Sequence, residues 1–343
     1  MKKYTINKLF LITFLVIILL LCFVVFNTNV HAAGFSFSAS PVQSGNENIS
    51  YFNLKSQPDQ THQLKVKLTN SGDSKMTVHA KVNTALTNDG MDVNYASNDA
   101  TKFDSSMRYP LSKLTTDGDK HDVSVPAKSD VTTTFNVKAP ASDFNGTVLG
   151  SLTFTSDPES SGNKGKVKIN NAYSYVIPVV MHQGSKSKPH LNATKADGKV
   201  INGVNTFYMH FKNDQPILMT GVEADNAVYT ADGYRNRDKP LYSNKKKNGS
   251  IAPNTNFNML LPTNKSFKSG DYVCVSKVYW GNNFWKYVKH FHMSISKAYE
   301  DNKTATNANN NDLWMWIMGV IIAILVLIIA AIAIMYFHNK KRK

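Results

Sequence analysis

Residues 62–68, HQLKVKL, alternate strictly between apolar and polar side chains. This alternation is typical of a β-strand with one buried face, because successive side chains of a strand point to opposite sides of the sheet. The pattern predicts that Leu64, Val66 and Leu68 face a hydrophobic core and that the two lysines face solvent. The stretch therefore indicates a β-rich domain built around a core on one side of this strand.

Similar short patterns recur along the chain at roughly ten-residue intervals, separated by clusters of Gly, Pro, Asn, Asp and Ser. We expect further strands at 76–82, 123–125, 131–137, 148–154, 173–181, 206–211, 218–224, 255–261, 272–280 and 285–295. No amphipathic helical stretch of ten or more residues separates them, which argues against an α/β enzyme fold. The predicted fold class is mostly β, with two tandem immunoglobulin-like antiparallel β-sandwiches.

The N-terminal 32 residues have the layout of a secretory signal peptide. Lysines at positions 2, 3 and 8 accompany an uncharged apolar run over 9–26, and the sequence Val-His-Ala ends at Ala32. We expect cleavage between Ala32 and Ala33, so residues 1–32 are assigned to the signal peptide.

Near the C-terminus, residues 313–337 carry no charged side chain. As a helix, with a rise of about 1.5 Å per residue, this stretch spans about 37 Å and predicts a transmembrane α-helix. The basic tail, residues 338–343, predicts a cytoplasmic C-terminus. The polar, Asn-rich stretch 299–312 is interpreted as a stalk. The predicted localisation is the cell membrane, single-pass, with an extracellular ectodomain in the cell-wall zone.

The ectodomain is too long for one sandwich of about 100 to 150 residues, so two domains are expected. We place the first sandwich at 33–183 and the second at 188–298, with the break in the sequence GSKSKP at 184–189. A competing break lies at 157–165, near residue 160, which is rich in Ser and Gly. The two alternatives differ in the domain to which the strand at 173–181 belongs.

Charge and cysteine content narrow the class of protein further. The chain has 39 basic and 24 acidic residues, so its formal net charge is +15. A basic surface favours anionic partners such as wall polymers or lipid headgroups, although ordinary solvation and a lysine-rich genome are the plainer explanation. Beyond the signal peptide, Cys274 is the single cysteine and no intramolecular disulfide is available. A disulfide-free secreted ectodomain rich in Asn and Lys favours a Gram-positive surface protein.

Motifs for catalysis are missing from the sequence. It contains no Gly-x-Ser-x-Gly, no His-Glu-x-x-His and no Walker loop, and its aspartates are scattered through turn-like segments. His290 and His292 have a spacing that zinc sites use, but we interpret them as exposed histidines on a solvated strand face. We expect no enzymatic activity, no cofactor and no metal site.

Binding residues are harder to predict. Trp280, Tyr234 and Tyr242 lie in or beside predicted loops, and aromatic side chains are favoured in protein interfaces and sugar stacking, so these three are weak binding candidates. Trp285 alternates in phase with Phe291 and is expected in the core. The run of three lysines at 245–247 is expected at a hairpin tip, and its extracellular location argues against nucleic acid as a partner.

Several short motifs, in order, resemble one family of surface proteins. In the first unit these are YFNL at 51–54, PDQ at 58–60, YPLS at 109–112, VPA at 125–127, Gly146 and Gly150 in FNGTVLGSLTF, and NNAYSYVIPVV at 170–180. In the second unit they are APN at 252–254, GDY at 270–272 and the ending from Trp285 to Phe291. With these motifs, the chain resembles the WxL-interacting proteins over about residues 36–296.

That resemblance implies a non-catalytic, membrane-anchored surface adaptor. Its first domain is expected to bind peptidoglycan, and its second to bind secreted WxL-domain proteins or host extracellular matrix proteins. Asp59 stands where the family commonly has Gly, which puts the positive φ of a type II turn in doubt. Two alternatives stay open, a membrane-tethered enzyme that modifies the cell wall and a direct adhesin for host matrix.

Overall fold

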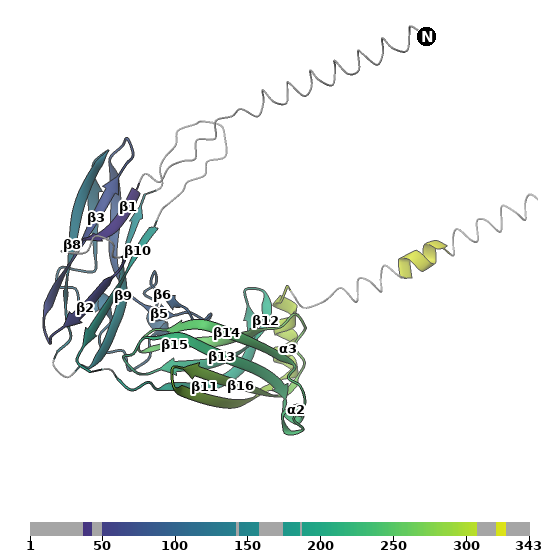
Figure 1. Cartoon of the computed structure of the whole chain (residues 1–343). Coiled ribbons are helices and arrows are strands. Elements are labelled where there is room, and N and C mark those ends of the chain that lie inside the picture. The colour runs from purple at the N-terminus through teal and green to yellow at the C-terminus, as the bar shows by residue number, and fades with distance from the viewer. Residues whose placement is uncertain are drawn as a thin grey trace, which may run out of the picture.

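The computed structural model describes residues 37–42, 50–141, 144–157, 174–185, 187–306 and 320–326, and these residues form two β-sandwiches that meet at an elbow (Figure 1). The predicted signal peptide, its cleavage site and the basic tail lie outside the described residues. Residues 320–326, within the predicted transmembrane span, are helical. Among the described residues, no helix is both long enough and apolar enough to cross a membrane.

The first sandwich pairs two sheets, and its strands include those expected at 76–82, 123–125, 131–137, 148–154 and 173–181. One sheet has the order β1-β3-β8, with β1 at Phe37–Val42, β3 at Thr61–Asn70 and β8 at Ser129–Lys138. The other has the order β2-β10-β9-β4-β7, made of β2 Phe52–Ser56, β10 Ser174–Gln183, β9 Gly146–Ser156, β4 Met76–Thr84 and β7 Lys120–Val125. Strand β2 departs from the predicted antiparallel pairing, since it runs parallel to β10.

The second sandwich follows the same plan. Its sheets have the orders β11-β12-β15 and β14-β13-β16-β17. The strands are β11 Leu191–Ile201, β12 Val204–Asn213, β13 Met219–Thr230, β14 Tyr242–Ile251, β15 Thr255–Pro262, β16 Gly270–Trp280 and β17 Asn283–Met293. A short helix α2, Ala231–Arg235, joins β13 to β14, and helix α3, Ile295–Thr304, follows β17.

The two sandwiches are a structural repeat. Apart from β2, each strand of the first sandwich has a counterpart in the second at the same place in chain order and sheet order, from β1 and β11 to β10 and β17. Strand β10 belongs to the first sandwich, because it pairs with β9 and β2 of that sandwich. By its hydrogen bonding, the chain therefore leaves the first sandwich after Gln183.

Two buried asparagines make this repeat visible in the side chains. Asn70, the last residue of β3, donates from Nδ2 to the carbonyl oxygens of Val125 (3.2 Å) and Pro126 (2.9 Å). Asn213, the last residue of β12, donates from Nδ2 to the carbonyl oxygen of Ala252 at 2.8 Å. Both side chains are fully buried. The motifs VPA at 125–127 and APN at 252–254 thus lie at equivalent turns of the two sandwiches, shifted by one residue, since Val125 corresponds to Ile251.

The hydrophobic core of the first sandwich confirms the alternation of the opening stretch. Leu64, Val66 and Leu68 are each 0% exposed and pack between the two sheets. In the second sandwich, Cys274 lies in the core. Burial raises the pKa of its thiol to about 12, so it is an inert, small hydrophobic side chain at neutral pH.

The turn from β2 to β3 keeps the backbone that the family motif requires. The Gln60 amide donates to the Gln57 carbonyl oxygen at 3.2 Å, and Asp59 has a φ of 60°. Aspartate is among the residues that tolerate this left-handed region best after glycine. The doubt raised by Asp59 is therefore resolved, since the positive φ is present without the glycine.

The connection between β4 and β7 leaves the first sandwich and packs against the second. We call residues 85–107 the clamp segment; it contains β5, Leu86–Thr87, and β6, Val93–Asn94. At its tip, Met91 is 1% exposed and belongs to the hydrophobic core of the second sandwich. The Met91 carbonyl oxygen accepts a hydrogen bond from the Ser250 amide at 2.8 Å. One domain thus supplies a core residue to the other.

Polar contacts along the clamp segment are buried at Thr87 and partly buried at Asp89. Thr87 Oγ1 lies 2.6 Å from Thr255 Oγ1 and accepts from the Ala252 amide at 2.9 Å. The Asp89 carboxylate accepts from the backbone and side-chain amides of Asn258 at 3.0 and 3.1 Å. The segment covers β14 and β15, which are the neighbouring edges of the second sandwich, and so protects them from pairing with other strands.

Two sequence interpretations need correction. The three lysines at 245–247 lie within strand β14, where Lys245 pairs with Asp225 and Lys246 with Asp92, and are not a hairpin tip. The predicted stalk does not begin at residue 299, because helix α3 continues to Thr304 and buries Ala298 in the second core. Asn302, one of the asparagines that suggested a solvated stalk, instead accepts from the Phe267 amide and donates to the Phe267 carbonyl oxygen.

Candidate functional site: a cleft at the domain junction

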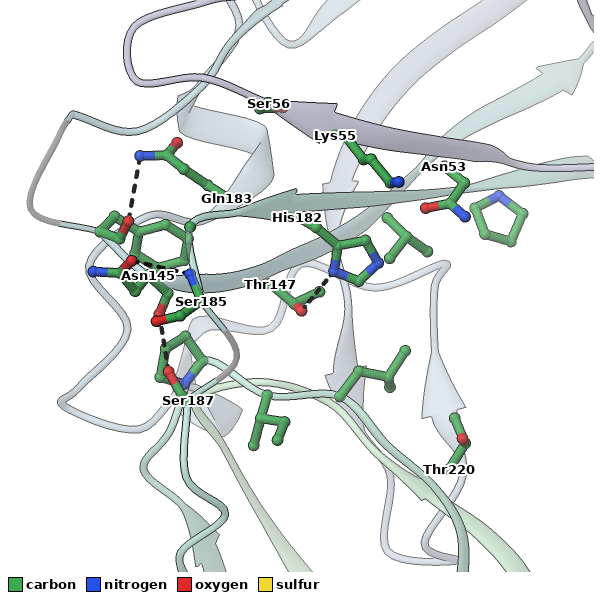
Figure 2. A pocket seen from close by; sticks show the side chains of 18 of the residues that line it. Asn53, Lys55, Ser56, Asn145, Thr147, His182, Gln183, Ser185, Ser187 and Thr220 are labelled. Atoms are coloured by element: carbon green, nitrogen blue, oxygen red, sulfur yellow. Dashed lines mark hydrogen bonds between the residues drawn. The ribbon is translucent and has the colours of Figure 1, made fainter.

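A large cleft lies inside the elbow, with a volume of about 1330 Å³. Its floor is the outer face of β2 and β10, and its opposite wall comes from residues 216–220 and Trp280 of the second sandwich. Figure 2 shows side chains from both domains around this space. The volume exceeds the roughly 300–1,000 Å³ of ordinary small-molecule pockets, so the cleft has room for a segment of a polymer.

The alternation of β2 and β10 determines the floor. In the parallel register, Asn53 pairs with Val180 and Lys55 with His182, so these four side chains share the outer face. Their neighbours Phe52 and Leu54 point toward the core of the first sandwich. Figure 2 shows Asn53, Lys55 and His182 along one side of the cleft. The family-like motif YFNL at 51–54, together with the following Lys55, therefore carries both core and cleft residues.

Aromatic rings from four separate segments line the cleft. These are Tyr51 before β2, Tyr95 after β6, Phe144 before β9, and Trp280 at the end of β16. Tyr51 is 43% exposed. The indole N–H of Trp280 donates to the Thr220 carbonyl oxygen at 2.9 Å, which holds the half-buried ring between the second core and the cleft.

Close backbone contact fixes the two walls relative to each other. The Thr147 amide donates to the Pro216 carbonyl oxygen at 2.8 Å across the domain junction. A Cβ atom on the adjacent Gly146 would lie 2.5 Å from that same oxygen, and Gly146 has a φ of 150°. Glycine at this position, one of the family-like motifs, is therefore required by the junction.

The charge of the cleft has one sign. Among the described residues that line the cleft, Lys55 is the one that carries a full formal charge, and none is an aspartate or glutamate. Within the described ranges, Lys55 makes no ion pair and the Asn53 side chain no hydrogen bond. An ammonium group without an internal partner favours an anionic group on a ligand.

The structure separates the predicted binding residues. Trp280 and Tyr242 both pack against the second core, but of the two only Trp280 lines the cleft; the Tyr242 ring lies 5.6 Å from that of Phe207. Tyr234 lies on α2, against Tyr229 and His290, at the end of the second sandwich away from the elbow (Figure 1). The three residues therefore do not form one site.

Three further residues from the sequence analysis, Trp285, His290 and His292, lie outside the lining of the described cleft. Trp285 packs against the second core, as expected. His292 Nδ1 lies 2.8 Å from the Asp271 carboxylate on an exposed face, while His290 faces the Tyr234 ring. Sequence reasoning missed Tyr51, Asn53, Lys55 and Tyr95 as cleft residues. The alternation of residues 51–55 around the inward Phe52 and Leu54 is the signal that could have identified the first three.

Two carboxylates make the junction sensitive to acid. Burial raises the pKa of Asp89, but hydrogen bonds from Lys102 and Asn258 outweigh burial and leave the pKa below its usual value. Asp104 behaves alike, with burial opposed by hydrogen bonds from Ser106 and by Lys212, and its pKa is also lowered. A depressed folded-state pKa stabilises the fold above the unfolded-state pKa of about 3.9, and this contribution is lost as the pH falls through the folded-state pKa.

We therefore expect the junction to loosen below about pH 4. Between pH 6 and pH 3, the melting temperature of the wild-type chain should fall further than that of the double variant Asp89→Asn/Asp104→Asn, which cannot titrate there. Differential scanning calorimetry across this pH range measures the difference. Equal slopes for the two proteins would contradict a role for these carboxylates.

Taken together, two repeated sandwiches and one large cleft at their junction define a two-domain β-sandwich protein. The chain belongs to the WxL Interacting Protein family, because the models of its two domains together match more than half of the sequence. The peptidoglycan binding domain matches residues 37–156, and the host binding domain matches residues 164–303. Both are binding domains, which supports a cell-surface binding adaptor. The second match begins before β10, although β10 pairs with strands of the first sandwich.

Solved structures show only distant likeness. An Escherichia coli chaperone, DraB, is 11% identical, with 76% of this chain and 99% of that chain covered and a TM-score of 0.28. A Salmonella enterica complex of the SafA pilin with the SafB chaperone gives 10% identity, coverage of 76% and 97%, and a TM-score of 0.31. These scores support no statement about function. A search of curated proteins finds no match.

Proposed function

We propose that this protein is a non-catalytic adaptor, anchored in the cell membrane by the helix predicted at residues 313–337, that holds secreted WxL-domain proteins close to peptidoglycan. The observation that best supports this proposal is the tandem match to a peptidoglycan binding domain and a host binding domain. The clamp segment adds a physical reason for the adaptor role. Because Met91 is shared between the domains, a ligand of one sandwich stands at a defined position relative to a ligand of the other.

The proposed topology follows from the sequence. The signal peptide is removed between Ala32 and Ala33, the sandwiches stand outside the membrane in the cell-wall zone, and the tail at 338–343 is cytoplasmic. The host binding domain also favours a second candidate function, direct adhesion to host matrix proteins. In both cases the first sandwich contacts the wall.

A sedimentation experiment tests the adaptor. The purified full-length chain, in detergent, is expected to sediment with isolated cell-wall sacculi and, while bound, to retain an added WxL-domain protein. Direct adhesion instead predicts that collagen or fibrinogen is retained without any WxL protein. If the chain stays in the supernatant when the sacculi are pelleted, and if it captures no WxL protein, the adaptor function is ruled out.

A further inference from the structure

The cleft between the domains combines three features that suit one class of ligand. Its volume of about 1330 Å³ is large enough for a polymer segment, it presents aromatic rings, and its single full charge is positive. A pyranose ring offers an apolar C–H face that stacks on aromatic rings, and its edges carry hydrogen-bonding groups. A glycan therefore matches the composition of the cleft better than an aliphatic ligand does.

The polar groups narrow the type of glycan. Asn53 offers an amide that can donate to and accept from the acetamido group of an N-acetylated sugar. Lys55, two residues further along β2 and on the same face, lies beside His182 on β10. The ammonium group of Lys55 is exposed and has no ion-pair partner in the described part of the chain. It suits a carboxylate on the sugar, as a lactyl ether or its attached peptide provides.

We propose that the junction cleft binds the glycan strand of peptidoglycan, with an N-acetylated sugar stacked between Tyr51 and Trp280, its acetamido group on Asn53 and a carboxylate of its lactyl ether or attached peptide on Lys55. The proposal rests on the proposed wall-binding function and adds where and how the wall is recognised. Trp280 belongs to the second sandwich, so the site is complete only when both domains are held together. Glycan binding therefore depends on the fixed arrangement of the two domains at the elbow.

Matched variants of the full-length chain test this site. The double variant Tyr51→Ala/Lys55→Gln removes one ring and the positive charge from the cleft. The control Tyr279→Ala/Lys65→Gln removes an equally exposed ring, 39% against 43%, and an exposed lysine without an ion pair among the described residues, both outside the cleft. Melting temperatures verify that both proteins fold.

The readout is the affinity for sacculi stripped of teichoic acids. The cleft variant is expected to bind at least about tenfold more weakly than wild type, and the control to bind like wild type. In calorimetry, Lys55→Gln should weaken binding of a soluble muropeptide but leave a neutral N-acetylglucosamine oligomer unaffected, whereas Tyr51→Ala should weaken both.

Distinct failures identify which idea is wrong. If wild type binds stripped sacculi and the cleft variant binds equally well, the cleft is not the glycan site, while wall binding stands. If wild type binds only sacculi that retain teichoic acids, a phosphate polymer is the ligand and the glycan proposal is overturned. If wild type binds neither preparation, the proposed wall-binding function itself falls.

Discussion

Replacing Met91 with alanine is expected to destabilise the second sandwich and to free the two domains from their fixed elbow. Met91 is 1% exposed, and its carbonyl oxygen is bonded to Ser250, so the substitution empties a core position without changing either backbone. Large-to-small changes at buried methionines cost about 2–5 kcal/mol. Calorimetry should show the second sandwich melting earlier, and small-angle X-ray scattering should show a wider spread of interdomain angles.

Methionine 209 provides the matched control. It is also 1% exposed in the same core, but it lies on β12, within the second sandwich. Met209→Ala should lower the melting temperature to a similar degree and leave the scattering-derived shape unchanged, while Met91→Leu should restore both properties. If Met91→Ala and Met209→Ala gave the same scattering curve, Met91 would have no special role at the junction.

Changing Asn70 to aspartate should be the most damaging single polar substitution in the first sandwich. The Asn70 Nδ2 group donates to the carbonyl oxygens of Ser74, Val125 and Pro126, and its Oδ1 accepts from the Gly72 amide. Alanine would leave these buried groups unpaired, at a cost of about 2–3 kcal/mol. Aspartate would in addition place a buried negative charge against carbonyl oxygens, so we expect a larger loss.

Urea denaturation at neutral pH measures the free energy of unfolding of each protein. We expect the value to be lowest for Asn70→Asp, higher for Asn70→Ala and highest for wild type. Asn213→Asp should damage the second sandwich in the same way, because Asn213 holds the equivalent position. Asn282→Asp, at the exposed turn between β16 and β17, is the neutral comparison. An Asn70→Asp protein as stable as wild type would show that the hydrogen bonds of this side chain contribute little.

Local pattern predicted the strands well because burial of a strand face leaves a direct trace in the sequence. The alternation at 62–68 gave the inward positions of Leu64, Val66 and Leu68, and Cys274 lies in the core expected of a small hydrophobic residue. The same pattern could not predict that β2 runs parallel to β10, since pairing direction depends on where a distant strand returns.

Contacts between the domains left no such trace. Met91 stands in TNDGMDVNY, a polar stretch that resembles a turn, and its burial is created by the second sandwich. Lysines 245–247 looked like a hairpin tip because their partners, Asp92 among them, are far away in sequence. The sequence predicted one cleft residue, Trp280, as a binding candidate. It did not predict the floor at Asn53 and Lys55, because that surface forms only when β2 pairs with β10.

Helix α3 determines how a pull on the C-terminal side of the chain enters the second sandwich. Strand β17 is an edge strand, and tension applied directly to its end would peel it from β16 one hydrogen bond at a time. Instead, Asn302 is bonded to Asn205 and Phe267, and Thr306 to the Gly203 carbonyl oxygen. A pull on residue 306 would therefore have to break these hydrogen bonds before it reached the end of β17.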